Sequence, residues 1–222
     1  MDIAANIAKI KNTLPQGVNL VAVSKTKPNP DILEAYHAGH KIFGENKVQE
    51  LVGKYEMLPK DIEWHFIGHP QTNKVKFIAP FVHLIHGVDS IKLLKVIDTE
   101  AKKNKREIAC LLQFHIAEED TKFGLYLNEA REILANNEFK SFRNVIITGV
   151  MGMATYTENT VQIRNEFKFL NVIFSTLKNE FFSGDKRFAE ISMGMSDDYQ
   201  IAVEEGSTLI RVGSKIFGER NY

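Results

Sequence analysis

Short apolar runs alternate with longer amphipathic runs along almost the whole chain, and this alternation most constrains the fold. Eight runs have the length and apolar content of buried strands, near 19–24, 41–43, 63–67, 82–86, 107–115, 145–151, 190–192 and 208–212. Helical patterns lie between them, near 31–38, 47–57, 72–78, 91–104, 128–136, 161–180 and 197–205. A further helical pattern at 3–12 precedes the first strand.

Regular alternation of strands and helices predicts a parallel sheet with right-handed crossovers, in the α/β class. Eight such units favour a closed (β/α)8 TIM barrel over an open doubly wound sheet. The additional helix lies at the N-terminal end. No linker rich in Pro, Gly or Ser divides the 222 residues. We therefore expect residues 1–222 to form a single domain.

Charge and cysteine content indicate which classes of partner and which cellular compartment fit this chain. Lys+Arg and Asp+Glu both number 28, so no single-sign field attracts nucleic acid or an anionic membrane. The one cysteine, Cys110, cannot form a disulfide within the chain, which fits a reducing compartment. We find no signal-peptide pattern and no apolar segment of bilayer length. We expect a cytoplasmic monomer without membrane or nucleic-acid partners.

Lys25 stands directly after the first apolar run. The carboxyl ends of parallel strands form the ligand-binding edge of α/β proteins, so this amine is expected to point into a crevice. A desolvated lysine loses basicity, and a neutral amine can attack a carbonyl. On this segment alone, a lysine that merely keeps its charge in water is the simpler interpretation.

The C-terminal third contains two turns that change this balance. After the seventh strand, Gly194 lets the backbone approach a ligand, and Ser196 supplies a hydroxyl at a helix start. After the eighth strand, Gly213 and Ser214 repeat the pattern. TIM barrels often bind phosphate with the loops that follow strands seven and eight. The two turns together predict a phosphate cradle.

A phosphate cradle that faces a strand-end lysine suggests pyridoxal 5′-phosphate (PLP), which carries an aldehyde and a phosphate on one ring. Arg211, just before the second turn, is placed to face the ring nitrogen. A guanidinium can only donate, so it would keep that nitrogen unprotonated and the ring a poor electron sink. The alternative for Arg211 is an ion pair with an acid at the barrel mouth, such as Glu45.

Motifs along most of the chain match a known family. They are Ala22–Lys27, Phe43–Glu50, Trp64–Gly68 with Gln71, Asn73 and Lys74, Lys122–Gly124, Gly149–Met153, Ser192–Tyr199 and Gly206–Gly218. With them the chain resembles the pyridoxal phosphate homeostasis proteins, the YggS/PROSC group, which are related in fold to the N-terminal barrel of alanine racemase. Pro70, Gly87 and Phe114–His115 depart from the family's usual residues beside the pocket.

The resemblance implies a cofactor site for PLP. Lys25 would carry the cofactor as a Schiff base, Arg211 would address the pyridine nitrogen, and Asn46 and His65 would line the pocket. The turn after strand seven would contact the phosphate, together with Gly213 and Ser214. The complete expected set is Lys25, Asn46, His65, Ser192, Gly194, Ser196, Arg211, Gly213 and Ser214.

The resemblance also implies a function. Proteins of this group bind PLP, supply or buffer it within the cell, and have no established catalytic reaction. We therefore expect a carrier whose partners include PLP-dependent apoenzymes. The main alternative is an alanine racemase-like enzyme, which needs a proton donor on each face of the substrate carbon. In racemases the second donor is a tyrosine of a separate C-terminal domain. We expect no such domain here, and Tyr156 or Tyr199 would have to substitute.

Two further possibilities concern other ligands. A phosphosugar-binding barrel would keep the phosphate cradle and use Lys25 on a sugar substrate. Histidine pairs with suggestive spacing, His65 with His69 and His83 with His86, lie across strands and loops. No cysteine or paired carboxylate in the sequence completes either pair, so we expect no metal site.

Overall fold

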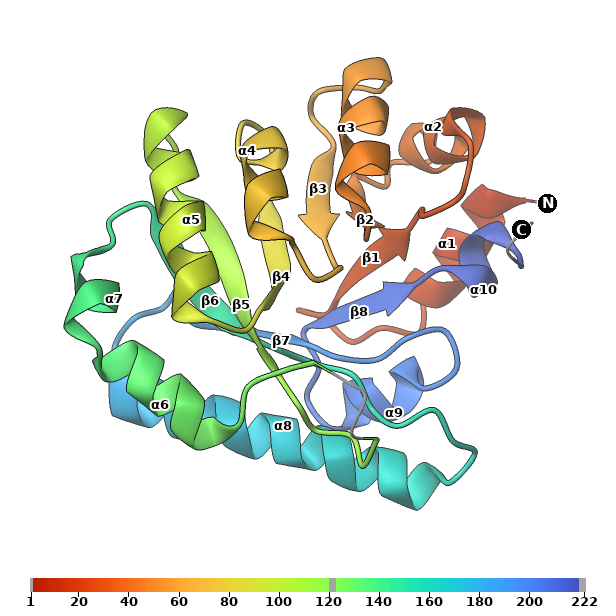
Figure 1. Cartoon of the computed structure of the whole chain (residues 1–222). Coiled ribbons are helices and arrows are strands. Elements are labelled where there is room, and N and C mark those ends of the chain that lie inside the picture. The colour runs from red at the N-terminus through yellow and green to blue at the C-terminus, as the bar shows by residue number, and fades with distance from the viewer. Residues whose placement is uncertain (1, 120–122, 220–222) are drawn as a thin grey trace.

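The computed structural model describes residues 2–119 and 123–219, and a closed barrel of parallel strands forms its centre (Figure 1). Each strand pairs with its neighbours in the sequence, and β1 pairs with β8 to close the barrel. The strands are β1 (Asn19–Val23), β2 (Ile42–Glu45), β3 (Glu63–Phe66), β4 (Leu84–Val88), β5 (Ile108–Phe114), β6 (Val145–Gly152), β7 (Glu190–Ser192) and β8 (Leu209–Val212).

Helices surround this barrel. They are α1 (Ile3–Lys11), α2 (Asn29–His37), α3 (Val48–Met57), α4 (Val75–Ile78), α5 (Ile91–Lys103), α6 (Leu127–Ala135), α7 (Asn137–Ser141), α8 (Thr160–Phe181), α9 (Tyr199–Glu204) and α10 (Ser214–Phe217). Helix α1, near the start of the chain, lies beside α10, near its end (Figure 1). The Asn6 side chain donates to the Ile216 carbonyl at 3.0 Å, which ties the two helices together.

The predicted TIM barrel with an additional N-terminal helix is confirmed. Some local details differ from the prediction. The segment expected as one helix at 72–78 is a 3-10 turn (Thr72–Lys74) followed by α4, and α7 had no counterpart in the sequence pattern. Strand β2 continues through Glu45, so this residue belongs to the barrel wall and not to the mouth.

Side chains that cap helix starts explain several boundaries. Ser90 accepts a hydrogen bond from the Leu93 amide at the start of α5. Asn159 accepts from two amides at the start of α8. Ser and Asn are among the residues preferred at this position before a helix. Helix α2 begins earlier than the pattern indicated, after Pro28, because proline near a helix start needs no amide partner.

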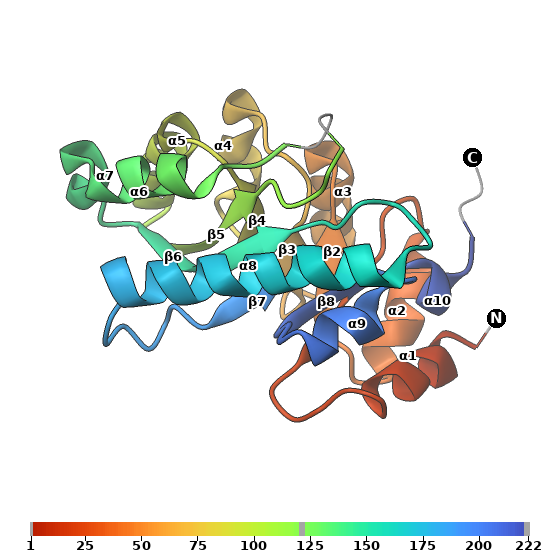
Figure 2. The same ribbon diagram turned by 90° about the horizontal axis from the view of Figure 1, so that it is seen from below.

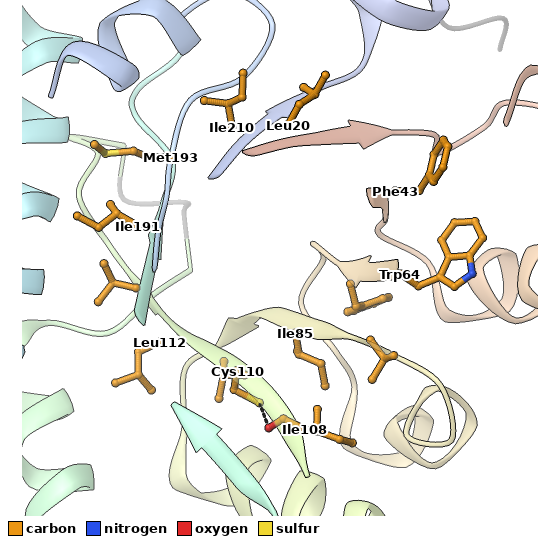
Figure 3. Packing of buried hydrophobic residues seen from close by; sticks show 14 of the residues in the cluster. Leu20, Phe43, Trp64, Ile85, Ile108, Cys110, Leu112, Ile191, Met193 and Ile210 are labelled. Carbon is orange, nitrogen blue, oxygen red and sulfur yellow. Dashed lines mark hydrogen bonds between the residues drawn. The ribbon is translucent and has the colours of Figure 1, made fainter. Parts of the chain in front are cut away.

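Two layers of apolar side chains hold the barrel. Outward-facing strand residues pack under the helices, and Figure 3 shows Phe43 and Trp64 of neighbouring strands side by side, with ring centroids 5.9 Å apart. The long helix α8 lies against β6 and β7 (Figure 2). A second cluster fills the barrel interior: Val21, Leu84, Leu111, Met151 and Leu209. Each fully buried side chain of this size contributes roughly 1.5–3 kcal/mol.

Cys110 belongs to the outer layer and is fully buried. Burial raises the pKa of its thiol, so the side chain serves as an inert apolar group. Among the helices of the described residues, none combines the length and the apolar character needed to cross a bilayer.

Candidate functional site

A cavity of about 410 Å³ opens at the carboxyl ends of the strands. Lys25 and Asn46 lie on one wall, after β1 and β2, and Met153 and Tyr156 follow β6. Of the predicted site residues, the cavity is lined by Lys25, Asn46, Ser196, Arg211, Gly213 and Ser214. The barrel therefore brings together residues up to about 190 positions apart, as the strand-end argument predicts.

The residue before Lys25 is fixed by a buried ion pair. The Ser24 hydroxyl donates to Glu45 Oε1 at 2.5 Å, and Lys54 Nζ donates to the same oxygen at 2.8 Å. Lys54 also donates to the Ser24 carbonyl at 2.8 Å. Burial raises the pKa of Glu45, and the nearby ammonium of Lys54 opposes this effect. The pair thus holds both the backbone and the side chain of Ser24.

The residue after Lys25 is fixed by the same network. Thr26 has a φ of +65°, a left-handed conformation that a β-branched residue rarely adopts. Its amide donates to Glu50 Oε1 at 2.6 Å, and Lys54 donates to that oxygen at 2.7 Å. Lys25 itself is half-buried and lies between these two anchored neighbours. The strained turn at Thr26 directs the backbone of Lys25 out of β1 and toward the cavity that Lys25 lines.

Glu45 is not the partner of Arg211. Its side chain points away from the barrel interior, toward Lys54 of α3, because Glu45 and Phe43 share the outer face of β2. Arg211 lies on the inner face of β8 and donates to the Ser192 hydroxyl at 2.5 Å and to the Gly152 carbonyl at 3.1 Å. The alternative of an ion pair between Arg211 and Glu45 is therefore wrong.

Arg211 forms part of the cavity floor and is 4% exposed. Burial lowers the pKa of its guanidinium to about 10, which still leaves it protonated at neutral pH. Two of its nitrogens bond to Ser192 and Gly152, and the group also borders the cavity. Arg211 therefore presents a fixed cationic donor to a ligand in the cavity.

Below this floor, buried side chains form a hydrogen-bonded chain. Ser192 Oγ is 2.9 Å from His86 Nδ1, and His86 Nε2 is 3.0 Å from His65 Nδ1. Burial lowers the pKa of His65 to about 3 and that of His86 well below its usual value, so both rings are neutral. His65 and Ser192 do not line the cavity, although both were predicted to contact the cofactor. They lie one layer deeper and support Arg211.

The two predicted phosphate turns meet. The Gly213 amide donates to Ser196 Oγ at 3.3 Å, and Ser214 begins α10 beside it. A Cβ at Gly213 would approach the Val23 carbonyl to 3.2 Å, so glycine allows the turn to lie close to β1. Gly194 has another role. Its φ is +91°, and a Cβ there would lie 2.6 Å from Ala202 of α9, so it allows close helix packing outside the cavity lining.

Sequence reasoning missed several residues of the cavity. Lys27 and Asp197 line the cavity. Each lies within two residues of a predicted site residue, Lys25 or Ser196. Tyr156 lines the cavity and is 88% exposed as a residue, whereas Tyr199 is buried. His86 lies at the end of a predicted strand, but its contact with Ser192 was not expected. Of the family motifs, Lys122 lies outside the described residues.

Comparisons with known proteins identify the family. A family model described as the N-terminal domain of alanine racemase matches residues 1–221. A pyridoxal phosphate homeostasis protein of Aquifex aeolicus (strain VF5) is 39% identical over 204 residues, which cover 91% of this chain and 87% of that protein. The chain belongs to the pyridoxal phosphate homeostasis protein family.

Two solved structures of PipY from Synechococcus elongatus PCC7942 are similar to this chain. The PipY structure with PLP bound has a TM-score of 0.88 at 34% identity and covers 97% of this chain and 100% of PipY. The PipY structure without PLP has a TM-score of 0.91. Alanine racemase of Clostridium difficile 630 shares the fold, with a TM-score of 0.75 at 13% identity, and this chain covers 57% of it.

Proposed function

We propose that this protein binds PLP in the cavity at the barrel mouth, through a Schiff base with Lys25, and takes part in intracellular PLP homeostasis. It holds the cofactor and supplies or buffers it for PLP-dependent apoenzymes. The observation that carries the proposal is that Lys25, Arg211 and the two turns with Ser196 and Ser214 all line one cavity. PipY, 34% identical to this chain, has a structure with PLP bound.

The residues present fit this cofactor. Small-molecule pockets typically measure about 300–1,000 Å³, and this cavity, at about 410 Å³, is of that size. PLP supplies an aldehyde for a lysine amine and a phosphate for hydroxyl and amide donors. Ser196 and Ser214 supply hydroxyls after β7 and β8, and Lys25 supplies the amine after β1, which pairs with β8. Ile67 and Met153 give the cavity apolar walls for a flat ring.

Arg211 would restrict the chemistry of a bound PLP. Its side chain stays protonated and is held by Ser192 and Gly152, so it can donate to a ring nitrogen but cannot accept from one. A pyridine nitrogen that faces only a donor stays unprotonated, and the ring withdraws electrons weakly. This arrangement supports a role in holding the cofactor. We expect Arg211→Glu to change the visible spectrum of the loaded protein.

We propose that the protein is a carrier and not an amino-acid racemase. Tyr156 is the phenol that lines the cavity, and its 88% exposure leaves it without the buried, oriented setting of a proton donor. The PLP-loaded protein is expected to form no D-alanine from L-alanine. D-Alanine that appears with the wild type and disappears with Tyr156→Phe would establish the racemase instead.

A titration with PLP tests the proposal. The wild type is expected to develop the shifted visible band of a lysine-bound cofactor, and Lys25→Ala is expected to show only the spectrum of unbound PLP. Lys27→Ala is the matched control, because Lys27 lines the same cavity and its Nζ donates to the Glu219 carbonyl at 2.7 Å. A wild-type protein without a shifted band, or an unchanged band in Lys25→Ala, contradicts the proposal. The first result would favour a phosphosugar ligand.

A further inference from the structure

A cluster of three side chains with metal-binding groups lies at the opposite end of the barrel from the cavity. Glu63 is the first residue of β3, His65 follows two positions later, and His83 directly precedes β4. Their ligand atoms all lie within 4.8 Å of one another, and His83 Nε2 is 3.9 Å from Glu63 Oε2. The cluster contains one histidine from each of the two pairs noted in the sequence, His65 and His83. Glu63 supplies the carboxylate that both pairs lacked.

The register of the barrel brings these groups together. Side chains alternate along a strand, so Glu63 and His65 share the inner face of β3 while Trp64 packs outward. The His83 amide donates to the Trp64 carbonyl at 2.8 Å, which places His83 beside this face. The rings of His65 and His83 are parallel, with an interplanar angle of 1° and centroids 5.6 Å apart. Backbone pairing therefore determines the positions of all three groups.

His65 can offer a lone pair toward the cluster. Its Nδ1 bonds to His86, so Nε2 is the nitrogen left for a ligand. If His65 Nδ1 donates to His86 Nε2, then His86 Nδ1 donates to Ser192, and His65 Nε2 is unprotonated. In the reverse arrangement Ser192 donates, and Nε2 carries the proton. Burial keeps the ring neutral in both cases. A second hydrogen bond that orients the ring is typical of metal-bound histidine.

We propose that Glu63, His65 and His83 bind one divalent first-row transition metal ion, with Zn²⁺ as the representative. Imidazole and carboxylate together suit this class of ion. Tetrahedral Zn²⁺ with bonds of about 2.1 Å needs its ligand atoms roughly 3.4 Å apart. The side chains of Glu63 and His83 are 46% and 56% exposed, so they can turn inward toward the fixed ring of His65.

The surrounding charges allow a cation here. Lys41 lies close enough to influence Glu63, but its Nζ bonds to Asp61 at 2.6 Å, and this carboxylate neutralises it. The site is separate from the PLP cavity, because neither Glu63 nor His83 lines that cavity. The proposal therefore stands independently of the proposed function.

Calorimetric titration with Zn²⁺ and native mass spectrometry test this site on the full chain after treatment with a chelator. The wild type is expected to bind one ion per chain at the cluster. His83→Ala and Glu63→Gln are each expected to weaken binding at least ~10-fold, since even the loss of an outer partner of a ligand costs about 10–100-fold. Both changes lie at partly exposed side chains, so the barrel should fold, which circular dichroism verifies.

His37→Ala is the matched control, because His37 is an exposed histidine on α2, outside the cluster. It is expected to bind Zn²⁺ like the wild type. The proposal is overturned if the wild type binds no Zn²⁺. It is also overturned if His83→Ala and Glu63→Gln keep the wild-type affinity, or if His37→Ala weakens binding as much as they do.

Discussion

Replacing Lys54 by methionine tests the network that positions Lys25. Lys54 Nζ donates to Glu45 at 2.8 Å, to Glu50 at 2.7 Å and to the Ser24 carbonyl at 2.8 Å. Its side chain is 7% exposed, and that of Glu45 is fully buried. Methionine would fill a similar volume but leave the Glu45 carboxylate in the core without its cation.

The expected cost is large for one substitution. Removing one partner of a buried ion pair typically costs about 3–5 kcal/mol, because the other charge stays buried and unpaired. For a chain of 150–250 residues, each kcal/mol lowers the melting temperature by roughly 2–4 °C. We therefore expect Lys54→Met to melt roughly 6–20 °C below the wild type. Loss of the donor to the Ser24 carbonyl should also weaken PLP binding.

Thermal unfolding followed by circular dichroism measures this effect. Lys95→Met is the control, because Lys95 Nζ bonds to Glu138 at 2.7 Å but its side chain is 63% exposed. An exposed pair of this kind contributes about 0–1 kcal/mol. Adding Glu45→Gln to Lys54→Met should recover part of the loss, since it removes the unpaired charge. The argument fails if Lys54→Met melts within about 3 °C of the wild type, or no lower than Lys95→Met.

Two other substitutions probe buried polar groups. Burial lowers the pKa of His40 from 6.5 to about 4. As pH falls from 6.5 to 4, the unfolded state therefore binds a proton that the folded state does not, and the folded state loses stability. Urea unfolding should show that the wild type loses about 2 kcal/mol more stability than His40→Gln between pH 7 and pH 5, and equal losses would refute this. Ser192→Ala leaves His86 and Arg211 without their shared hydroxyl and should cost about 2–3 kcal/mol. A loss below about 0.5 kcal/mol would show that water replaces it.

The barrel could be predicted from sequence because each strand and helix has a local signal. Lys25, Ser196, Gly213 and Ser214 lie between the end of a strand and the first residue of the following helix, and such residues necessarily gather at the carboxyl edge. Arg211 was placed at the mouth for the same reason, although it lies within β8. The order of strands and their ends therefore accounts for the cavity.

Pairing between distant residues could not be predicted in the same way. His86 and Ser192 are 106 positions apart, and their contact depends on the stagger of the closed barrel. His65 was expected in the pocket from the family resemblance, but it lies one layer lower in the barrel, where it contacts His86. Glu45 was expected at the mouth because the predicted strand ended two residues early, which hid its outward orientation toward Lys54.

Mass analysis of the protein after borohydride reduction in the presence of PLP tests the central claim most directly. Reduction makes a Schiff base permanent, so the added mass can be assigned to one peptide and then to one residue. We expect one PLP adduct per chain, located on Lys25. An adduct on Lys27 or on other lysines in place of Lys25, or no adduct at all, would contradict the account.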